Sequence, residues 1–425
     1  MLMNLFLKNQ LKIHKFFENL VILVPIFLIT GPFLSDLSIS LLSIYYFFIR
    51  KKNHDNERVI KIFFVFIFLF YILILISSVL AEDKILSIKN SLFYLRFILF
   101  SICFFYLLKN NEKILLKLFF VLILCFIILI FDGLFQSYFK INIIGLQINE
   151  EYFGSRVSSF FGDELILGSY LTRFSPIIIG LGYFFFKDKR GFNIFLILFI
   201  FFMEIIVFLS GERTAFVLFN MILFLLLLLL NDSKKLSVLI FLVVSIIITG
   251  LIVHDGPSKK RIINETIKDL KPKSYNSEFV IINRQYHEHF LSAFQMFKDN
   301  ILFGVGPKNF RVVCKQQKYN FSEYTCSTHP HNTYIQLLSE TGIFSFLIIF
   351  CLFLIVSFLL LKQLYFKIFK KTFFLNNLEI CILIHIFVSL FPLTPTGSFF
   401  NNWTSIMYYY PIAIIFWSFH KKKIL

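Results

Sequence analysis

Charged residues are scarce in this sequence, and stretches that alternate between apolar and polar residues are scarcer still. Only 16% of the 425 residues are charged, whereas 58% are hydrophobic and 62 residues are Phe. A soluble domain of this length could not bury so much apolar surface. The lack of strand-like alternation also argues against a membrane β-barrel, whose strands alternate between lipid-facing and lumen-facing residues.

What the sequence does contain is long apolar runs, such as "MILFLLLLLL" from Met221 to Leu230. Backbone polar groups must be paired inside lipid, so runs of this length favour helices. We therefore predict an all-α, polytopic inner-membrane bundle of about twelve transmembrane helices. A turn near Ser35 and Asp36 would separate the first two spans. The predicted spans are residues 20–34, 37–50, 61–80, 91–108, 115–132, 165–186, 192–209, 214–230, 236–253, 336–361, 377–393 and 404–419.

Acidic residues are few, which leaves a net charge of +17. The positions of the basic residues explain the excess better than nucleic acid binding does, because they gather in alternate loops between spans. Cytoplasmic loops carry an excess of Lys and Arg, so we predict cytoplasmic N- and C-termini. No cleavable signal peptide is expected, because a second span follows the first apolar segment. Basic residues of the predicted cytoplasmic loops include Lys187, Lys189, Arg190, Lys367, Lys370 and Lys371.

The predicted topology divides the chain into three parts. Residues 1–253 hold the first nine spans, residues 254–332 form one large periplasmic loop, and residues 333–425 hold the last three spans. The loop contains Cys314 and Cys326, which in an oxidising compartment predict either a disulfide or, alternatively, two free thiols. The loop is the only segment outside the spans long enough to form a small domain.

Two motifs stand out inside the loop. The stretch "NRQYHEHFLSAFQMFKDN" predicts an amphipathic helix with an aromatic face on the membrane or the bundle, because it places at helical spacing Tyr286, Phe290, Ala293, Phe294 and Phe297. It leads into "FGVGPKNF", where Gly304 and Gly306 predict a tight turn. A phosphate-binding loop is the alternative for this turn, although the strand and helix of a P-loop are missing around it.

Ionisable residues within the predicted spans are Arg96, Arg173, Glu204 and His385. An Arg inside the bilayer costs about 2.5–3.5 kcal/mol, so its presence needs a reason. One interpretation is that Glu204 pairs with an Arg and joins helices. The other is a polar cavity that opens outward, since Arg96, Arg173 and Glu204 fall in the outer halves of their spans.

Further Arg residues lie on the same predicted side of the membrane. Arg213, in "SGERTAF", directly precedes a span, and a cation there opposes the helix dipole. Either the neighbouring Glu212 compensates, or an anionic ligand binds both Arg213 and the helix end. Arg156 and Arg284 face the same compartment. Several guanidinium groups on one face suit a phosphate or diphosphate, whose oxygens they bind bidentately.

The stretch "HPHNTYIQLLSETGIF" leads from the loop into the tenth span. Thr333 and Gln336 predict a capping box there, which would put His331 and Asn332 at the outer membrane surface. A neutral imidazole can accept a proton from a hydroxyl near physiological pH. The alternatives are an inert loop histidine and a metal site formed by two H-x-H pairs, His287 with His289 and His329 with His331. Residues two apart on a helix do not face each other, so the first pair is a poor chelate and a metal site is disfavoured.

With these residues identified, the chain resembles the O-antigen ligase and polymerase family of bacterial envelope enzymes. The family motif is His followed by Asn, Ser or Gln, nine residues, Gly, two residues, and then Gly, Thr or Tyr. Here His331, Asn332 and Gly342 match, while Ser345 departs from the last position. The "SGERTA" turn and the "DNILFGVGPKNF" segment resemble two further family features. The likeness covers most of the chain from about Ile88 onward.

The resemblance implies an inner-membrane glycosyltransferase of the GT-C-like helical class, active on the periplasmic face without a metal or cofactor. The implied donor is a glycan on undecaprenyl diphosphate. A ligase transfers it to lipid A–core, and a polymerase transfers it to another lipid-linked repeat unit. By the motifs, His331, Arg213 and Arg284 correspond to the catalytic residues. Arg96, Arg156, Arg173, His329 and Asn332 are the predicted substrate-binding residues.

Two classes of function outside this family remain as alternatives. A solute or polysaccharide transporter would be expected to show internal repeats and broken helices with charges at the membrane midplane, whereas the charges here lie in the outer half. A sensor would need a cytoplasmic output domain, and the chain has no segment for one. We expect membrane lipids as partners and no nucleic acid.

Overall fold

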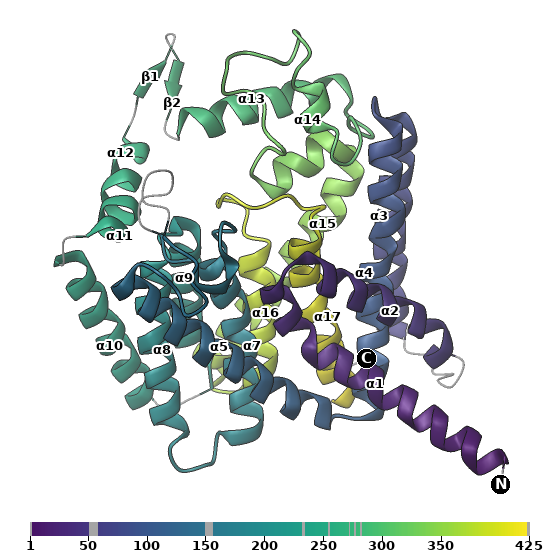
Figure 1. The fold of residues 1–425 in the computed structure, drawn as a ribbon, viewed down its shortest axis with the longest axis vertical. Helices are drawn as coiled ribbons and strands as arrows, with labels where there is room; N and C mark the ends of the chain where they lie inside the picture. Colours follow the sequence, from purple (N-terminus) through teal and green to yellow (C-terminus); the bar gives the residue numbers. More distant parts are fainter. Residues whose placement is uncertain are drawn as a thin grey trace.

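The computed structural model is a bundle of helices with a layer of short elements at one end (Figure 1). It describes residues 2–50, 58–148, 156–231, 234–253, 256–271, 273–275, 278–280 and 283–422. Each predicted span coincides with a helix, so the predicted all-α polytopic fold is confirmed. The helices of the bundle are α1 (Leu2–Thr30), α2 (Pro32–Arg50), α3 (Arg58–Leu80), α4 (Lys84–Asn110), α5 (Lys113–Phe139), α7 (Leu167–Phe186), α8 (Phe192–Leu209), α9 (Arg213–Leu229), α10 (Lys234–Val253), α15 (Thr333–Tyr365), α16 (Asn377–Ser389) and α17 (Asn402–Lys421).

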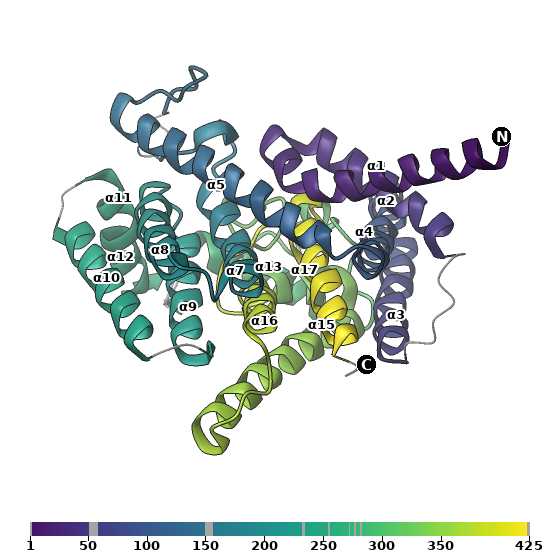
Figure 2. The same ribbon diagram turned by 90° about the horizontal axis from the view of Figure 1, so that it is seen from below.

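Not all of these helices have the length and composition of a simple membrane span. Within the described residues, 6 helices are long and apolar enough to cross a membrane: α1, α2, α4, α5, α8 and α15. Shorter apolar stretches of 10–17 residues belong to α3, α9, α10 and α16. The helices α7 and α17 are 20 residues long and largely buried by their neighbours, so they form the centre of the bundle (Figure 2).

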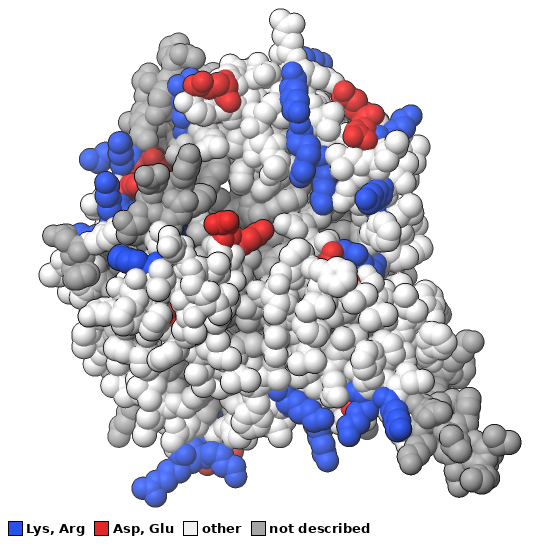
Figure 3. Space-filling view, in the orientation of Figure 1, with Lys and Arg blue, Asp and Glu red and all other residues white. Residues whose placement is uncertain are grey.

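The surface has the charge distribution of a membrane protein. On the face shown in Figure 3, a broad band without charged side chains separates two charged ends. The lower end carries mostly Lys and Arg, whereas the upper end, where the loop elements lie, carries both signs. An uncharged band between two charged ends agrees with a membrane protein.

The first two helices are joined by a break at a single glycine. Gly31 has a φ of 119°, and it separates α1 from α2, which begins at Pro32. The predicted turn near Ser35 and Asp36 is therefore wrong, because both residues lie inside α2. The left-handed conformation is easily reached only by glycine, and a proline is favoured at the first position of a helix, so Gly31 and Pro32 make the better helix boundary.

The large loop is built from short helices and one small hairpin, which the sequence did not predict. Its strands β1 and β2 pair antiparallel, with Lys273 opposite Val280. The loop cysteines Cys314 and Cys326 form a disulfide, which excludes the alternative of two free thiols. The elements of this layer are α11 (Pro257–Lys259), the π-helix η2 (Lys260–Glu265), α12 (Thr266–Leu270), β1 (Lys273–Tyr275), β2 (Glu278–Val280), α13 (Arg284–Asp299) and α14 (Phe310–Val313).

The predicted loop helix exists as α13. Its N-cap is Asn283, whose side chain accepts from the backbone N–H of Gln285 at 2.9 Å. The buried residues include His289, Ala293 and Met296, whereas Phe294 is 43% exposed. Ala293, a member of the predicted face, is thus buried within the protein, and Phe294 of the same face is left at the surface. The smaller side chains allow α13 to approach α14 and α15 closely, and they join a small separate core with Phe310.

The helix α15 is broken at Gly342, which has a φ of 75° and a ψ of −176°. Just before the break, the main-chain carbonyls of Ser339 and Glu340 accept hydrogen bonds from outside the helix. Val305 donates to Ser339 at 2.9 Å and Gly306 donates to Glu340 at 2.8 Å. The Gly-rich turn of the loop is therefore fastened to a membrane helix through its backbone.

This contact decides between the two interpretations of the Gly-rich turn. The backbone N–H groups of Val305 and Gly306, which a phosphate loop would offer to its ligand, are already donated to α15. Gly304 has a φ of 65° and lies against the backbone at Thr341, where a side chain would overlap. The turn is thus a packing device, and glycine is needed because backbone meets backbone.

The intramembrane charges have partners other than those suggested by the sequence. The Glu204 carboxylate accepts from the Asn220 amide at 3.0 Å, so the predicted pairing of Glu204 with an Arg is wrong. His385 lies between the main-chain carbonyls of Arg173 and Met407, at 2.5 and 2.9 Å. The histidine on α16 therefore ties α7 to α17 at the centre of the bundle.

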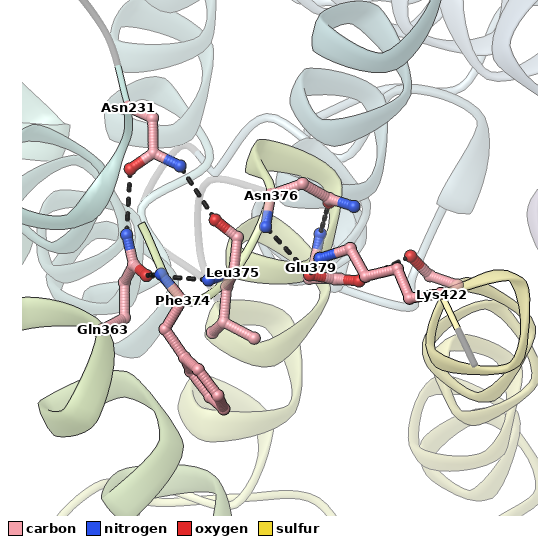
Figure 4. A network of polar contacts seen from close by, with 8 residues as sticks. Asn231, Gln363, Phe374, Leu375, Asn376, Glu379 and Lys422 are labelled. Carbon is pink, nitrogen blue, oxygen red and sulfur yellow. Dashed lines mark hydrogen bonds and ion pairs between the residues drawn. The ribbon is translucent and has the colours of Figure 1, made fainter. Parts of the chain in front are cut away.

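A network of polar contacts closes the opposite end of the bundle (Figure 4). Gln363 of α15 donates to Asn231 at 2.9 Å and accepts from the backbone of Phe374 and Leu375. Glu379 of α16 forms a capping box with Asn376, and Lys422 pairs with the same carboxylate. The loops after α9 and α15 and the end of α17 are thereby held together, which leaves the other end of the bundle to form the cavity described next.

We predict that Gly342→Ala destabilises the protein. A Cβ at residue 342 would overlap the carbonyl of Leu302, and the left-handed backbone is unfavourable for alanine, so the free energy of unfolding should fall by about 2 kcal/mol or more. The matched control is Gly250→Ala in α10, where an added Cβ meets nothing within 4 Å. Thermal midpoints of the purified proteins in detergent test this; equal midpoints for both variants would contradict the account of the helix break.

Candidate active site

A cavity of about 700 Å³ opens at the end of the bundle that carries the loop elements. Its wall is formed by the break between α1 and α2, the segment before α7, the start of α9, part of η2 and α13, and residues 395–404 before and within α17. The predicted site residues that line it are Arg156, Arg173, Arg213, His329 and His331. Residues from distant parts of the sequence thus meet in one cavity.

The lining also includes residues for which the sequence predicts no role at a site. Arg261 is one of several basic residues in the loop, and Trp403 begins an apolar span, so neither carries a local signal of function. Their role becomes visible only when the folded chain brings them to the cavity. The lining residues that were missed include Glu164, Arg261, Tyr286, Asn401, Asn402 and Trp403.

The turn before α9 gathers three guanidinium groups. Arg156 donates from Nε to the Ser210 carbonyl at 3.3 Å, and Arg261 donates from Nε to the Gly211 carbonyl at 3.0 Å. Gly211 has a φ of 66°, and a Cβ there would lie 2.9 Å from Cγ of Arg156. Arg213 follows at the first position of α9. Glycine at 211 therefore lets the chain turn while two arginines pack against it.

These cations lie close enough to affect one another. Burial lowers the pKa of Arg156, the nearby Glu212 carboxylate opposes this, and Arg261 and Arg213 lower it further. A guanidinium stays charged despite such shifts, because its unperturbed pKa is above 12. The result is a concentrated positive charge in a partly buried wall, which is a suitable environment for an anion.

Glu212 does not compensate Arg213 in the way that its position in the sequence suggested. Its carboxylate accepts from the backbone N–H groups of Gly168 and Ser169, at 2.6 and 3.1 Å, and so caps α7. Arg213 pairs instead with Asp269 of α12 at 2.8 Å. Two neighbouring residues of opposite charge thus serve different helices, and the cation at the start of α9 is balanced from the loop.

Arg173 is 7% exposed and faces the cavity from α7. Its guanidinium lies 5.3 Å from the ring centroid of Trp403, the first Trp of α17. A cation over an aromatic ring is stabilised by about 2 kcal/mol when both are desolvated, which offsets part of the cost of burial. The ring of Trp403 and the charge of Arg173 therefore form one unit of the cavity wall.

Arg96 lies behind the wall rather than on it. Its Nη2 is 3.3 Å from the Asp36 carboxylate and donates to Oδ1 of Asn402 at 2.9 Å. Asn402 itself lines the cavity. Arg96 thus supports the first turn of α17 and joins α2, α4 and α17, which agrees with a structural role for this intramembrane charge.

Two further predicted residues are also absent from the lining. Arg284, the first residue of α13, lies over the ring of Tyr324 at 5.3 Å and 3.9 Å from Glu288. Asn332 is the N-cap of α15 and accepts from the backbone N–H groups of Tyr334 and Ile335. The predicted capping box of Thr333 is therefore wrong: the cap is one residue earlier.

Gln336, the presumed partner in that capping box, reaches across to the segment before α17. It accepts from the backbone N–H of Phe399 at 2.8 Å and donates to Ser398 at 3.0 Å. The first turn of α15 and residues 395–404 thus form a continuous wall. This wall carries the two histidines on one side and Trp403 on the other.

Three imidazole rings lie close together, and two of them, those of His329 and His331, line the cavity. The ring of His331 lies 4.1 Å from that of His329 and 5.3 Å from that of His289 on α13, measured between centroids. Tyr286, also on α13, lies 5.6 Å away. His331 has a left-handed φ of 59°, and its Nε2 is 3.0 Å from the Ser327 hydroxyl. Non-glycine residues in this conformation are uncommon and store strain, which is frequent at functional sites.

Hydrogen bonds orient His329 and the backbone of His331. Nε2 of His329 lies 3.1 Å from the Thr396 carbonyl, and Nδ1 lies 2.9 Å from the Thr328 hydroxyl. A carbonyl can only accept, so Nε2 carries the proton and Nδ1 accepts from the hydroxyl. Thr396 also donates its N–H to the main-chain carbonyl of His331 at 2.9 Å. One residue of the segment before α17 therefore positions both histidines.

Burial and the neighbouring imidazoles keep these rings neutral. Burial, followed by the charge of His331, lowers the pKa of His329 to about 3 and that of His289 to about 4. Burial also lowers the pKa of His331. A neutral imidazole has a free lone pair, so the cavity contains a base that remains available at physiological pH.

The cluster does not have the arrangement of a metal site. In the ranges that the structure describes, no group of three or more His, Cys, Asp or Glu side chains is placed to hold a metal ion. The rings of His289, His329 and His331 are stacked or tilted against one another instead of converging on one point. Their geometry suits packing and proton chemistry better than coordination.

Because the pKa values of His329 and His289 are lowered below 6.5, the folded state binds fewer protons than the unfolded chain near pH 5. Their contribution to stability is complete above pH 6.5 and is lost as the pH falls toward 4. We predict that the free energy of unfolding decreases below pH 6.5, by up to about 1.4 kcal/mol per pH unit for a buried histidine. The thermal midpoint should decrease with it.

Variants separate these histidines from other titrating groups. His329→Gln and His289→Phe should each flatten the decrease, whereas His14→Gln, at the opposite end of the bundle, should not. Thermal midpoints between pH 7.5 and 4.5 provide the measurement. If the three variants show the same slope as the unaltered protein, the histidines do not govern its acid sensitivity.

A comparison with known families agrees with the geometry. Residues 196–350 match the family described as O-antigen ligase, a region that extends from α8 through the loop into α15 and includes Arg213 and His331. No curated protein matches the chain. The match supports a glycosyltransferase-type activity of the ligase or polymerase kind. Over residues 196–350 this membrane protein is therefore similar to the O-antigen ligase family.

Proposed function

We propose that this protein is an O-antigen ligase-type enzyme that transfers a glycan from undecaprenyl diphosphate to a sugar hydroxyl of lipid A–core. The reaction would take place on the periplasmic face of the inner membrane. The observation that carries the proposal is the cavity itself, in which a neutral imidazole and several guanidinium groups meet although they are far apart in the sequence. The family match independently covers the residues that would do the chemistry.

In this proposal the guanidinium groups bind the diphosphate of the donor. Arg213 supplies the main contact, with Arg156 and Arg261 beside it on the same turn. The planar guanidinium binds phosphate oxygens bidentately, and it stabilises the charge that develops on the leaving diphosphate. The ion pair of Arg213 with Asp269 would have to open or share its cation when the donor binds.

Arg284 would act from the edge of the cavity. It begins α13 two residues before Tyr286, which is part of the lining, and its guanidinium rests on Tyr324 in the structure. Contact with the diphosphate or the first sugar therefore requires its side chain to leave that ring. We assign it a supporting role in donor binding, next to that of Arg213.

His331 would accept the proton of the acceptor hydroxyl. The acceptor oxygen attacks the anomeric carbon of the donor, the bond from that carbon to the diphosphate oxygen breaks, and polyprenyl diphosphate leaves with the electron pair. The hydroxyl proton moves to the imidazole, and the anomeric configuration inverts because the attack comes from the face opposite the leaving group. General base catalysis of this kind contributes about 10²–10⁴-fold to a rate.

The apolar part of the wall suits the lipid tail of the donor. The break between α1 and α2 contributes Leu28, Ile29 and Pro32 to the lining, which also contains Phe160 and Phe161. Beyond this point Phe33 is 74% exposed on the side of the bundle. A polyprenyl chain could enter between these elements from the membrane while its diphosphate reaches the arginines.

The proposal requires no metal ion or cofactor. Guanidinium groups supply the positive charge for the leaving diphosphate, and the imidazole takes the proton, so each step is assigned to a residue of the chain. A polymerase would use the same cavity, donor and chemistry, and would differ only in its acceptor, which is a lipid-linked repeat unit. The acceptor is therefore tested directly in the experiment below.

We predict that His331→Ala and Arg213→Ala each lower glycan transfer about 100-fold or more, because the first removes the base and the second removes a transition-state contact. The measurement is the envelope glycan ladder of ligase-null and polymerase-null hosts that express each variant, with membrane insertion confirmed by immunoblot. If the unaltered protein restores the ladder only in the ligase-null host, it is a ligase. If it restores the ladder only in the polymerase-null host, it is a polymerase.

Matched controls use the same residue types away from the cavity. Arg190→Ala changes an exposed Arg between α7 and α8, and His420→Ala changes the histidine at the end of α17. Both should restore the ladder as well as the unaltered protein does. Full activity of the His331 or Arg213 variant would refute the proposed mechanism.

A further inference from the structure

Tryptophan is rare in this chain: there are two, Trp403 and Trp417, and both lie on α17. Trp417 is 4% exposed and packs within the bundle, whereas Trp403 stands in the first turn of the helix and lines the cavity. One of the two indole rings of the chain is therefore placed at the candidate active site.

The indole of Trp403 is held by a ring contact rather than by a hydrogen bond. Arg173 lies 5.3 Å from the ring centroid. The indole N–H is buried, and no acceptor for it is present in the part of the chain that the structure describes. Tryptophan N–H groups usually find a partner when buried, so packing of this ring takes priority over satisfying its polar atom.

The position of the ring follows from the segment that carries it. Thr396 positions His329 and His331, and the same segment continues through Asn401 and Asn402 to Trp403. Arg213 and its neighbouring cations line the same cavity from the start of α9. A substrate that contacts both the cations and His331 therefore occupies a cavity whose wall includes an indole.

We propose that Trp403 is the sugar-binding surface of this cavity, with its ring packed against the apolar C–H face of a sugar of the donor or the acceptor. This inference rests on the proposed function, since it names which part of the substrate the ring contacts. An indole offers a large, rigid apolar area with little entropy to lose on binding, and Arg173 fixes its orientation. Trp403 thus contributes to binding, and the bond-making steps belong to other residues.

The two-tryptophan composition permits a direct binding test. In Trp417→Phe the only remaining indole is Trp403, so its emission reports on this wall of the cavity. The detergent-purified full chain is titrated with three probes: a polyprenyl-diphosphate-linked disaccharide, polyprenyl diphosphate without sugar, and lipid A–core. A saturable change with the disaccharide probe or with lipid A–core, and none with bare polyprenyl diphosphate, is expected and also identifies the source of the sugar.

The same titration of Trp403→Phe, where only Trp417 emits, should show no change. An equal response of Trp403 to bare polyprenyl diphosphate would overturn the proposal, because the ring would then report on the phosphate at Arg173. The absence of a response to all three probes would overturn it as well. Neither result depends on turnover. The binding test can therefore fail while the variants of His331 and Arg213 still support the proposed function, and it can succeed while they do not.

Kinetics give a second measure. Trp403→Ala should raise the KM for one substrate, donor or acceptor, about tenfold with little change in kcat, which corresponds to a binding contact of about 1.4 kcal/mol. Trp403→Phe keeps an aromatic surface and should recover most of that loss. If Trp403→Ala has normal turnover and an unchanged KM for both substrates, Trp403 does not bind sugar.

Discussion

The candidate site depends on two main-chain hydrogen bonds between the loop and a broken membrane helix. Because Gly342 interrupts α15, the carbonyls of Ser339 and Glu340 are free to accept from Val305 and Gly306. The helix α13 leads into this turn, so the two bonds set its position above the bundle. His289 of α13 is thereby brought against His331. A loop with little core of its own gains a fixed position from the membrane helix that it joins.

The cavity is charged in a way that suits a transient anionic ligand. Arg156 and Arg261 are held by backbone carbonyls, which orient a guanidinium without neutralising it. Glu212, the nearest carboxylate in the sequence to Arg213, is occupied in capping α7. Arg213 keeps its ion pair with Asp269, so an anionic ligand that binds this cation competes with a carboxylate.

The sequence predicted much of the fold because the composition of a short segment is enough to identify a membrane helix. Apolar runs of sufficient length give spans, and each predicted span was found as a helix. The errors arose where the outcome depends on contacts with other elements. The burial of His289 in α13 and the pairing of Glu204 with Asn220 depend on which neighbour lies opposite, and no local pattern records that.

Taken alone, the sequence determined the membrane class, the presence of a large loop, and a motif around His331 that indicates a family of enzymes, because composition and short spacing are properties of adjacent residues. Only the tertiary structure decided which charged residues share a cavity. It brought Arg156, Arg213 and Arg261 to one turn and added Trp403, while it left Arg96 and Arg284 outside the lining. The reason is physical: side chains distant in the sequence become neighbours only through helix packing and backbone contacts, which form together when the chain folds.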